Sequence, residues 1–145
     1  MGIKKQIENY LKEFKYNVGF IDGDLQSVVE GSGNVKVNWL KHDYKHSWFA
    51  DPFILDVTDD EIILLAEEWY DPIGRGRISK LVIDRRRFEL KQLKVVLETA
   101  THLSFPAIDR KPDGIYIHPE NSAARCLEEY KYDPVTDCCT KTRIL

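Results

Sequence analysis

The sequence has no excess of positive charge. Its 145 residues carry 21 Lys and Arg against 24 Asp and Glu, which gives a formal net charge of −3. A nucleic-acid-binding surface needs clustered basic side chains, because its affinity comes from neutralised phosphates. The one basic run, Arg85 to Arg87, falls between two strand-like segments and is typical of a solvated turn. We therefore expect no nucleic-acid partner.

Cysteine and long hydrophobic runs are also scarce. The three cysteines are Cys126, Cys138 and Cys139, an odd number without the Cys-x-x-Cys spacing of a metal site. This pattern favours free thiols in a reducing compartment, and we expect neither a metal nor a cofactor. No segment resembles a signal peptide or a membrane span. The sequence therefore predicts a cytoplasmic protein with no membrane partner.

What is present is a globular composition, with 43% hydrophobic and 31% charged residues. At the start of the chain, apolar residues recur at helical spacing and predict an amphipathic helix of about four turns. These residues are Ile3, Ile7, Tyr10, Leu11 and Phe14. Strand-like segments follow at 16–21 and 35–40. We treat 1–47 as a helix with lead-in strands.

From Trp48 onward the chain repeats itself. Residues 48–98 and 99–145 each contain four short strand-like segments separated by turns. Matching residues recur in order at near-equal separations: Pro52 with Pro106, Glu67 with Glu120, and Asp84 with Asp133. Four strands at a period near fifty residues are typical of a propeller blade.

The predicted fold is therefore mainly β. It is a partial β-propeller of two four-stranded antiparallel blades, preceded by an N-terminal amphipathic helix. The alternative is a β-sandwich, which also uses many short strands but does not require this self-similarity.

Carboxylates stand at positions where a propeller carries its chemistry. The first strand of a blade lines the central channel, and Asp51 begins such a strand. It is a candidate base or acceptor for sugar hydroxyls, and the alternative is a turn cap. Glu67 and Glu68 are adjacent on a strand, so only one can face a shared site. The repeat aligns Glu67 with Glu120, and we predict that Glu67 and Glu120 share a pocket. The alternative is that these glutamates are solvated strand ends.

Three more residues are candidates for substrate binding. His102 precedes the channel strand of the second repeat, and Ser104 lies within that strand. Trp69 follows the glutamates and is able to stack on a sugar face. For His102 and Trp69 the alternative is an ordinary structural role, since a lone histidine is more often structural and an aromatic residue here also suits packing between blades.

These motifs resemble those of a known family. The segments 49–53 (Phe-Ala-Asp-Pro-Phe), 66–68 (Ala-Glu-Glu), 102–106 (His-Leu-Ser-Phe-Pro) and 119–120 (Pro-Glu) resemble the five-bladed propellers of glycoside hydrolase family 43, the arabinanases and β-xylosidases. The likeness is closer to the propeller domain of bacterial carbohydrate loci and of plant glucosamine inositolphosphorylceramide transferases. It covers roughly residue 16 to the end of the sequence.

The resemblance implies roles and also exposes gaps. Such hydrolases use an Asp base in the first blade, which Asp51 matches. A second Asp that tunes the site is not matched, since Ser104 and Phe105 precede Pro106 in the second repeat. The Glu acid of a later blade has no counterpart, because five blades require about 250 residues. Catalytic candidates are therefore Asp51, Glu67 and Glu120.

We expect a glycosidase-like carbohydrate-binding fragment that associates with copies of itself. The alternatives are an inverting glycoside hydrolase completed by oligomerisation, and a non-catalytic interaction or structural module. Self-association is expected because two unclosed blades leave sheet faces uncovered, with apolar area at 62–66 and 115–117.

Overall fold

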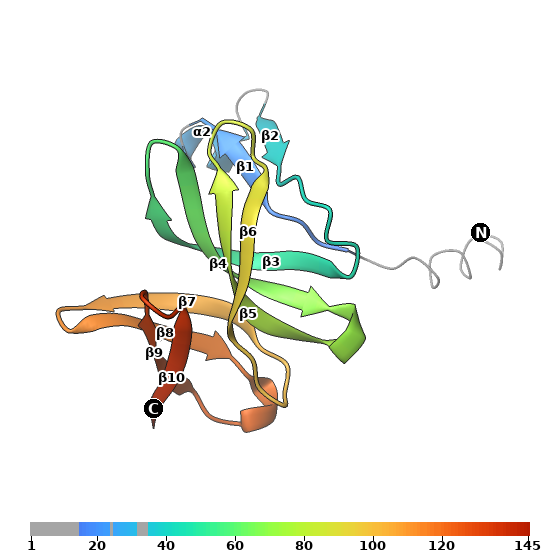
Figure 1. The fold of residues 1–145 in the computed structure, drawn as a ribbon. Helices are drawn as coiled ribbons and strands as arrows, with labels where there is room; N and C mark the ends of the chain where they lie inside the picture. The colour runs from blue at the N-terminus through green and yellow to red at the C-terminus, as the bar shows by residue number, and fades with distance from the viewer. Residues whose placement is uncertain (1–14, 24, 32–34) are drawn as a thin grey trace.

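The structure is a computed structural model that describes residues 15–23, 25–31 and 35–145. The described chain is mainly β and contains three antiparallel sheets (Figure 1). The amphipathic helix predicted at 3–14 lies outside the described residues. The prediction of a mainly β fold with two four-stranded antiparallel sheets is confirmed.

A small hairpin precedes the two larger sheets. It pairs β1 (Gly19–Asp22) with β2 (Lys36–Trp39), and the short helix α2 (Leu25–Val29) lies between them in the chain. This helix has five residues, and no described helix has the length and apolar character that crossing a bilayer requires.

The first large sheet is formed by the segment that the sequence predicts as the first repeat. Its strands are β3 (Ser47–Val57), β4 (Glu61–Tyr70), β5 (Arg75–Asp84) and β6 (Leu90–Leu97). Each strand pairs with the next in sequence order, so the sheet is a simple meander. A 3₁₀ turn, η1 (Asp71–Ile73), joins β4 to β5.

The second large sheet repeats this arrangement. Its strands are β7 (Ser104–Lys111), β8 (Gly114–Glu120), β9 (Glu128–Asp133) and β10 (Cys138–Ile144), again paired in sequence order. The turn η2 (Ser122–Ala124) joins β8 to β9, as η1 joins β4 to β5. All three cysteines have free thiols.

The two sheets share unusual backbone geometry at matching positions. Non-glycine residues rarely adopt positive φ, yet Asp51 (47°) and Phe105 (45°) both do so directly before a proline. Positive φ also occurs at Phe88, shortly before the last strand of the first sheet, and at Asp137, directly before the last strand of the second sheet. The repeat in the sequence is therefore a repeat of turns and bulges as well as of strands.

The Asp84 and Asp133 match has a structural cause. Asp84 accepts hydrogen bonds from the backbone N–H groups of Arg86 and Arg87, and Asp133 accepts one from Val135. A side-chain carboxylate that accepts backbone N–H groups two or three residues on is the usual way an aspartate stabilises a turn. Both aspartates thus shape the last turn of their sheets.

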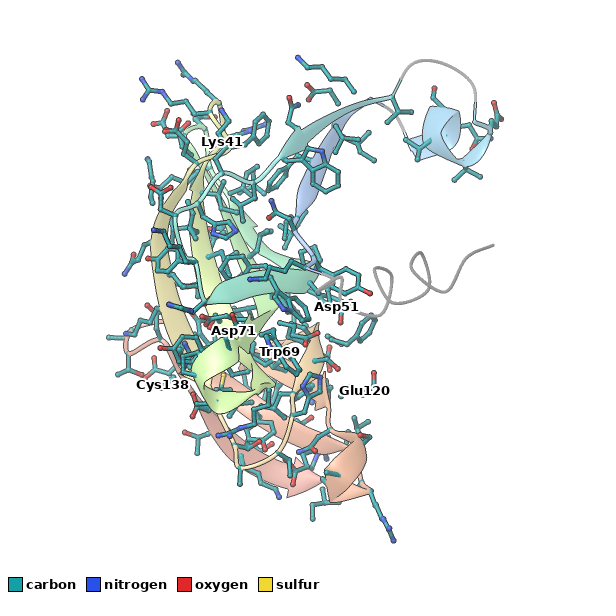
Figure 2. The ribbon with its side chains drawn as sticks, turned by 90° about the vertical axis from the view of Figure 1, so that its right-hand side faces the viewer. Lys41, Asp51, Trp69, Asp71, Glu120 and Cys138 are labelled. Atoms are coloured by element: carbon teal, nitrogen blue, oxygen red, sulfur yellow. The ribbon has the colours of Figure 1, made fainter. Side chains whose placement is uncertain are left out.

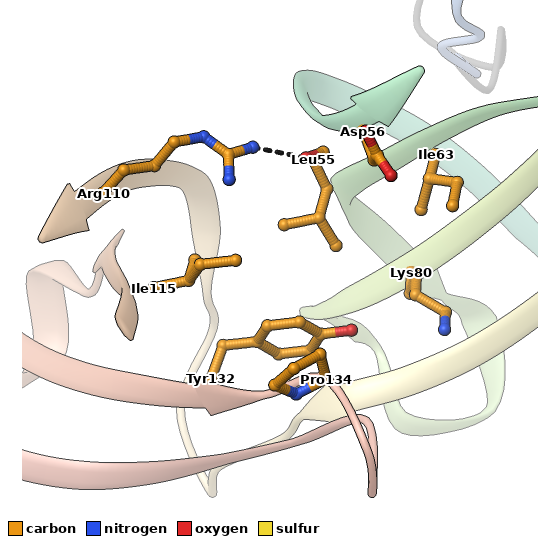
Figure 3. A pocket seen from close by; sticks show the side chains of 8 residues that line it. All are labelled: Leu55, Asp56, Ile63, Lys80, Arg110, Ile115, Tyr132 and Pro134. Carbon is orange, nitrogen blue, oxygen red and sulfur yellow. Dashed lines mark hydrogen bonds between the residues drawn. The ribbon is translucent and has the colours of Figure 1, made fainter. Parts of the chain in front are cut away.

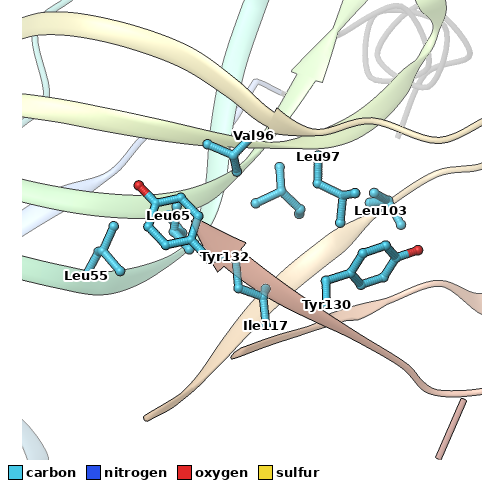
Figure 4. Packing of buried hydrophobic residues seen from close by; sticks show 9 residues of the cluster. Leu55, Leu65, Val96, Leu97, Leu103, Ile117, Tyr130 and Tyr132 are labelled. Carbon is cyan, nitrogen blue, oxygen red and sulfur yellow. The ribbon is translucent and has the colours of Figure 1, made fainter. Parts of the chain in front are cut away.

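One apolar layer lies between the two large sheets (Figure 4). Leu65 and Ile78 enter it from the first sheet, and Ile117 enters it from the second; all three are fully buried. The other buried members are Leu55, Val96, Leu97, Leu103, Tyr130 and Tyr132. Burial of apolar side chains of this size stabilises each by about 1.5–3 kcal/mol relative to exposure, so this layer is the main attachment between the sheets.

The other face of the first sheet is covered by the lead-in segment. Phe49, Leu64 and Leu81 are buried there against Val18 and Leu40. The lead-in is therefore part of the core.

The outer face of the second sheet is polar. Glu129 is paired there with Lys111 and Arg143, and His118 lies 3.9 Å from both Asp109 and Glu129. Leu64, Leu65, Ala66 and Ile117 are buried within the chain. The expectation of uncovered apolar area at 62–66 and 115–117 is therefore wrong for these four side chains, because the facing sheet and the lead-in cover them. Ile62, Ile63 and Ile115 are partly buried.

The apolar layer predicts the cost of truncating Ile117. We expect Ile117→Ala to lower the free energy of unfolding by about 3 kcal/mol, because it leaves a cavity between two sheets that cannot collapse freely. Urea denaturation measures this change. The matched control is Ile144→Ala, at a side chain that is 60% exposed, which should change stability by less than about 0.5 kcal/mol. Equal losses in the two variants would contradict the assignment of this layer as the core.

Candidate functional site

Three carboxyl groups from the two large sheets lie close together. Glu67 on β4 interacts electrostatically with Asp51 on β3 and with Glu120 on β8. Figure 2 shows Asp51, Glu120 and the neighbouring Trp69 on the same side of the molecule. Glu67 pairs across its sheet with Ala50, and Glu120 pairs with Ser104. The two glutamates therefore occupy equivalent positions, each opposite the start of the first strand of its sheet.

A bulge places Asp51 beside Glu67. The register of β3 on β4 shifts between Ala50 and Phe53, and Asp51 has a φ of 47° within this interval. β-bulges re-aim side chains and are common next to functional sites. A non-glycine residue in this conformation is strained and persists only where its surroundings hold it. The site therefore depends on local backbone strain.

Glu67 is held in an unusual environment. It is 6% exposed, and burial, the neighbouring Asp51 carboxyl with its hydrogen bond, and the charge of Glu120 together raise the pKa of Glu67 to about 7. Burial disfavours a carboxylate, and nearby carboxylates disfavour it further. Glu67 is consequently a carboxyl group that binds or releases its proton near neutral pH.

The adjacent Glu68 has a different role. Its side chain accepts hydrogen bonds from the hydroxyls of Ser47 and Ser79 and forms a two-nitrogen ion pair with Arg77. A buried carboxylate with this many donors has its hydrogen-bonding capacity satisfied. Glu68 is thus a structural residue on the opposite face of β4. Arg77 forms an ion pair with Glu68, whereas the charged groups that act on Glu67 are the carboxyl groups of Asp51 and Glu120.

His102 also faces the carboxyl cluster. It lies in the connection from β6 to β7, and its Nε2 atom is 3.5 Å from Oε1 of Glu67. Its Nδ1 atom accepts a hydrogen bond of 2.8 Å from the backbone N–H of Gly76. The side chain is half-buried, and its ring contacts Trp69. Of the predicted binding residues, His102 and Trp69 are therefore brought to the cluster.

Aromatic rings continue from this contact across the first sheet. Trp69 is stacked on Trp48, with ring centroids 5.5 Å apart and planes 5° apart, and Trp48 contacts Tyr16. The pair arises because β3 and β4 place Trp48 directly opposite Trp69. A row of partly exposed rings beside carboxyl groups offers apolar faces and hydrogen-bond acceptors together.

A cavity of about 480 Å³ opens at this row. It is lined by Tyr16, Trp48, Asp51 and Glu67, together with residues 17–19, 49–50 and 52. Cavities of this size are typical of small-molecule sites, which combine aromatic walls with a few polar groups. The cavity lies beside one end of the carboxyl cluster.

Ser104 and Phe105 mark where the second sheet differs. Ser104 pairs with Glu120 and is partly buried. Phe105 has the backbone conformation of Asp51, but its ring is 50% exposed and contacts Phe53 edge-on. The second sheet thus presents an apolar ring where the first presents a carboxylate, so the cluster is asymmetric.

A second cavity, of about 420 Å³, lies between the sheets near the far ends of β3 and β7 (Figure 3). Its polar side chains already have partners: Arg110 donates to the carbonyl of Leu55, and Lys80 is paired with Asp137. Because these groups stabilise the contact between sheets, this cavity is a weaker candidate than the carboxyl cluster.

Sequence reasoning missed Gly76, Trp48 and Tyr16 as parts of the site. A Cβ atom at Gly76 would lie 2.5 Å from the carbonyl oxygen of Leu103 and 2.7 Å from Oε1 of Glu67. Glycine is therefore required where the connection 98–103 packs on β5. Trp48 lies opposite Trp69 because of the register of β3 on β4. That register depends on the bulge between Ala50 and Phe53, which the sequence does not reveal.

Comparisons of the chain with protein-family models, with curated proteins and with solved structures found no match. The family resemblance thus stays a prediction. Among the described residues, no group of three or more His, Cys, Asp or Glu side chains is arranged to hold a metal ion.

The pKa of Glu67 predicts a pH dependence of stability. The folded pKa of about 7 exceeds the ordinary glutamate pKa of 4.5, so the folded state holds this proton more tightly than the unfolded chain. The resulting stabilisation is complete below about pH 4.5 and is lost as the pH rises through about 7, a span of roughly 3 kcal/mol. We expect urea midpoints to fall between pH 5 and pH 8.

Glu67→Gln cannot ionise and should lose most of this dependence. Glu89→Gln, at an exposed carboxylate, is the control and should keep the slope of the unaltered protein. Identical slopes for Glu67→Gln and the unaltered protein would show that Glu67 ionises normally.

Proposed function

We propose that the chain is a glycosidase-like, carbohydrate-binding β-propeller fragment and that its ligand lies over the boundary between the two four-stranded sheets. The observation that carries this proposal is the convergence of Asp51, Glu67 and Glu120 beside the Trp48–Trp69 stack. Carboxyl oxygens accept hydrogen bonds from sugar hydroxyls, and aromatic rings cover the apolar face of a sugar ring.

The arrangement of the sheets supports the propeller part of the proposal. Both are sequence-ordered meanders of four strands with equivalent bulges. Their first strands, β3 and β7, lie against each other, and the Phe53–Phe105 contact joins them. First strands that face one another around an axis are the arrangement of blades in a propeller.

Binding is favoured over hydrolysis because of how two of the carboxyl groups meet. An inverting glycosidase separates its acid and base by about 6.5–9.5 Å to leave room for a water molecule. Asp51 and Glu67 instead share a hydrogen bond. This pair is too close to act from the two sides of a glycosidic bond, although it is well placed to bind hydroxyl groups.

Trp69 provides the test of binding. We expect Trp69→Ala to weaken binding of arabino- or xylo-oligosaccharides by about tenfold or more, through loss of the stacking surface. Titration calorimetry on ligands selected by a glycan screen measures the effect. Trp39→Ala is the matched control, because Trp39 is 57% exposed on the hairpin strand β2 and is not among the residues that line the cavity. Equal effects of both substitutions, or no binding to any glycan, would reject the proposal in favour of an interaction module.

A hydrolase completed by oligomerisation is the second candidate, and one observation favours it. A glutamic acid with a pKa of about 7 suits a general acid at neutral pH. A second copy of the chain would then supply the carboxylate that Asp51 is too close to provide. We propose self-association for both candidates, but only hydrolysis requires it, so a dependence of turnover on the oligomer separates them.

Chromogenic arabinosides and xylosides test this candidate. We expect no turnover by the protein at concentrations where light scattering gives the mass of a monomer. Turnover that appears with the oligomer, is lost in Glu67→Gln and falls as the pH rises above about 7 would establish the hydrolase and displace the binding proposal. Glu89→Gln again serves as the control and should leave any turnover unchanged.

A further inference from the structure

We propose that His102 is a positioning residue for Glu67, fixed in a single tautomer by Gly76 and donating from Nε2 toward the Glu67 carboxyl group. The inference rests on the proposed function, since it concerns the same site, but its first test needs no ligand.

The connection that carries His102 is anchored to β5 at several points. Gly76 donates to Nδ1 of His102 and accepts from the backbone N–H of Leu103 at 3.0 Å. Arg75 donates to the carbonyl of Thr99 at 3.0 Å. The connection therefore has little freedom beside Glu67, and a side chain at Gly76 would displace it.

The Gly76 hydrogen bond determines which nitrogen of His102 carries the proton. A neutral imidazole has one donor and one acceptor nitrogen. Because Nδ1 accepts from a backbone N–H, its lone pair is occupied and the proton resides on Nε2. An imidazolium would place a second N–H against that of Gly76. The ring consequently donates through Nε2, which faces Oε1 of Glu67 at 3.5 Å.

This donor acts against the other groups that face Glu67. Those groups are Asp51 from β3 and Glu120 from β8, which both disfavour the Glu67 carboxylate. The 3.5 Å separation is longer than an ordinary N–H···O hydrogen bond, so His102 acts on Glu67 as a facing polar N–H, which favours the charged form of a carboxyl group. Because Oε1 is the oxygen that faces His102, the contact favours one rotation of the Glu67 carboxyl group. His102 thus orients the carboxyl group and limits how strongly it retains its proton.

Two substitutions at His102 separate its two contacts. Asn at this position keeps an acceptor near the place of Nδ1, for Gly76, but removes the donor to Glu67. Gln keeps a donor near the place of Nε2. We expect His102→Asn to raise the pKa of Glu67 by about 1 pH unit, and His102→Gln to return it toward the value of the unaltered protein. Carboxyl carbon NMR of the ligand-free protein measures both. His46→Asn, at an exposed histidine, is the matched control.

The tautomer has a direct measurement. Long-range nitrogen–proton NMR spectra of the imidazole should show a protonated Nε2 and an unprotonated Nδ1 in the unaltered protein. The Nδ1–H tautomer, or an unchanged Glu67 pKa in both His102→Asn and His102→Ala, would overturn the inference. A variant that failed to fold would leave the tautomer measurement, which uses the unaltered chain, as the deciding result.

Binding experiments then distinguish this inference from the proposed function. If His102 positions Glu67 for a ligand, His102→Asn should also weaken oligosaccharide binding, and His102→Gln should restore part of it. If the Glu67 pKa shifts as expected but no glycan binds, the positioning role stands and the carbohydrate proposal fails. If binding is normal in His102→Asn and the pKa is unchanged, the carbohydrate proposal stands and the positioning role fails.

Discussion

The packing of two four-stranded sheets across one apolar layer is the interaction on which the candidate site depends. Glu67 belongs to the first sheet and Glu120 to the second, so their proximity exists only while Leu65, Ile78 and Ile117 hold the sheets together. The connection 98–103 crosses between the sheets, so the position of His102 depends on both. Loss of this packing would separate Glu67 from Glu120 even if every residue of the site were unchanged.

Two adjacent glutamates show how the same chemistry acquires different roles. Glu68 lies directly opposite Arg77 on β5, whereas Glu67 lies opposite Ile78. The alternation of side chains along a strand places the two carboxyl groups on opposite faces of the sheet. Arg77 lies on the same face as Glu68 and forms an ion pair with it. Glu68 is therefore neutralised as an ion pair and stabilises the sheet, while Glu67 is left among other carboxyl groups with a raised pKa.

Most strands were predictable because their signals are local. Alternating apolar residues and turn-forming pairs locate the eight strands of the two sheets to within a few residues, and the Asp84 and Asp133 match reflects a hydrogen-bonded turn. The bulges at Asp51 and Phe105 were not predictable, because positive φ at these residue types has no sequence signature. The burial of 62–66 also depends on the lead-in segment, whose contact with the first sheet is long-range.

The bulge explains why the candidate site is one-sided. Both sheets keep the same strained conformation before a proline, so the strain belongs to the architecture of the first strand in each sheet rather than to a single functional residue. What differs is the side chain: Asp51 turns toward Glu67, whereas Phe105 packs against Phe53 and helps to join the two first strands. One bulge thus supplies a polar group and the other supplies packing. A ligand bound at Asp51 and Glu67 would consequently be bordered by Glu120 of the second sheet and by His102 of the connection 98–103, and not by a second copy of the Asp51 position.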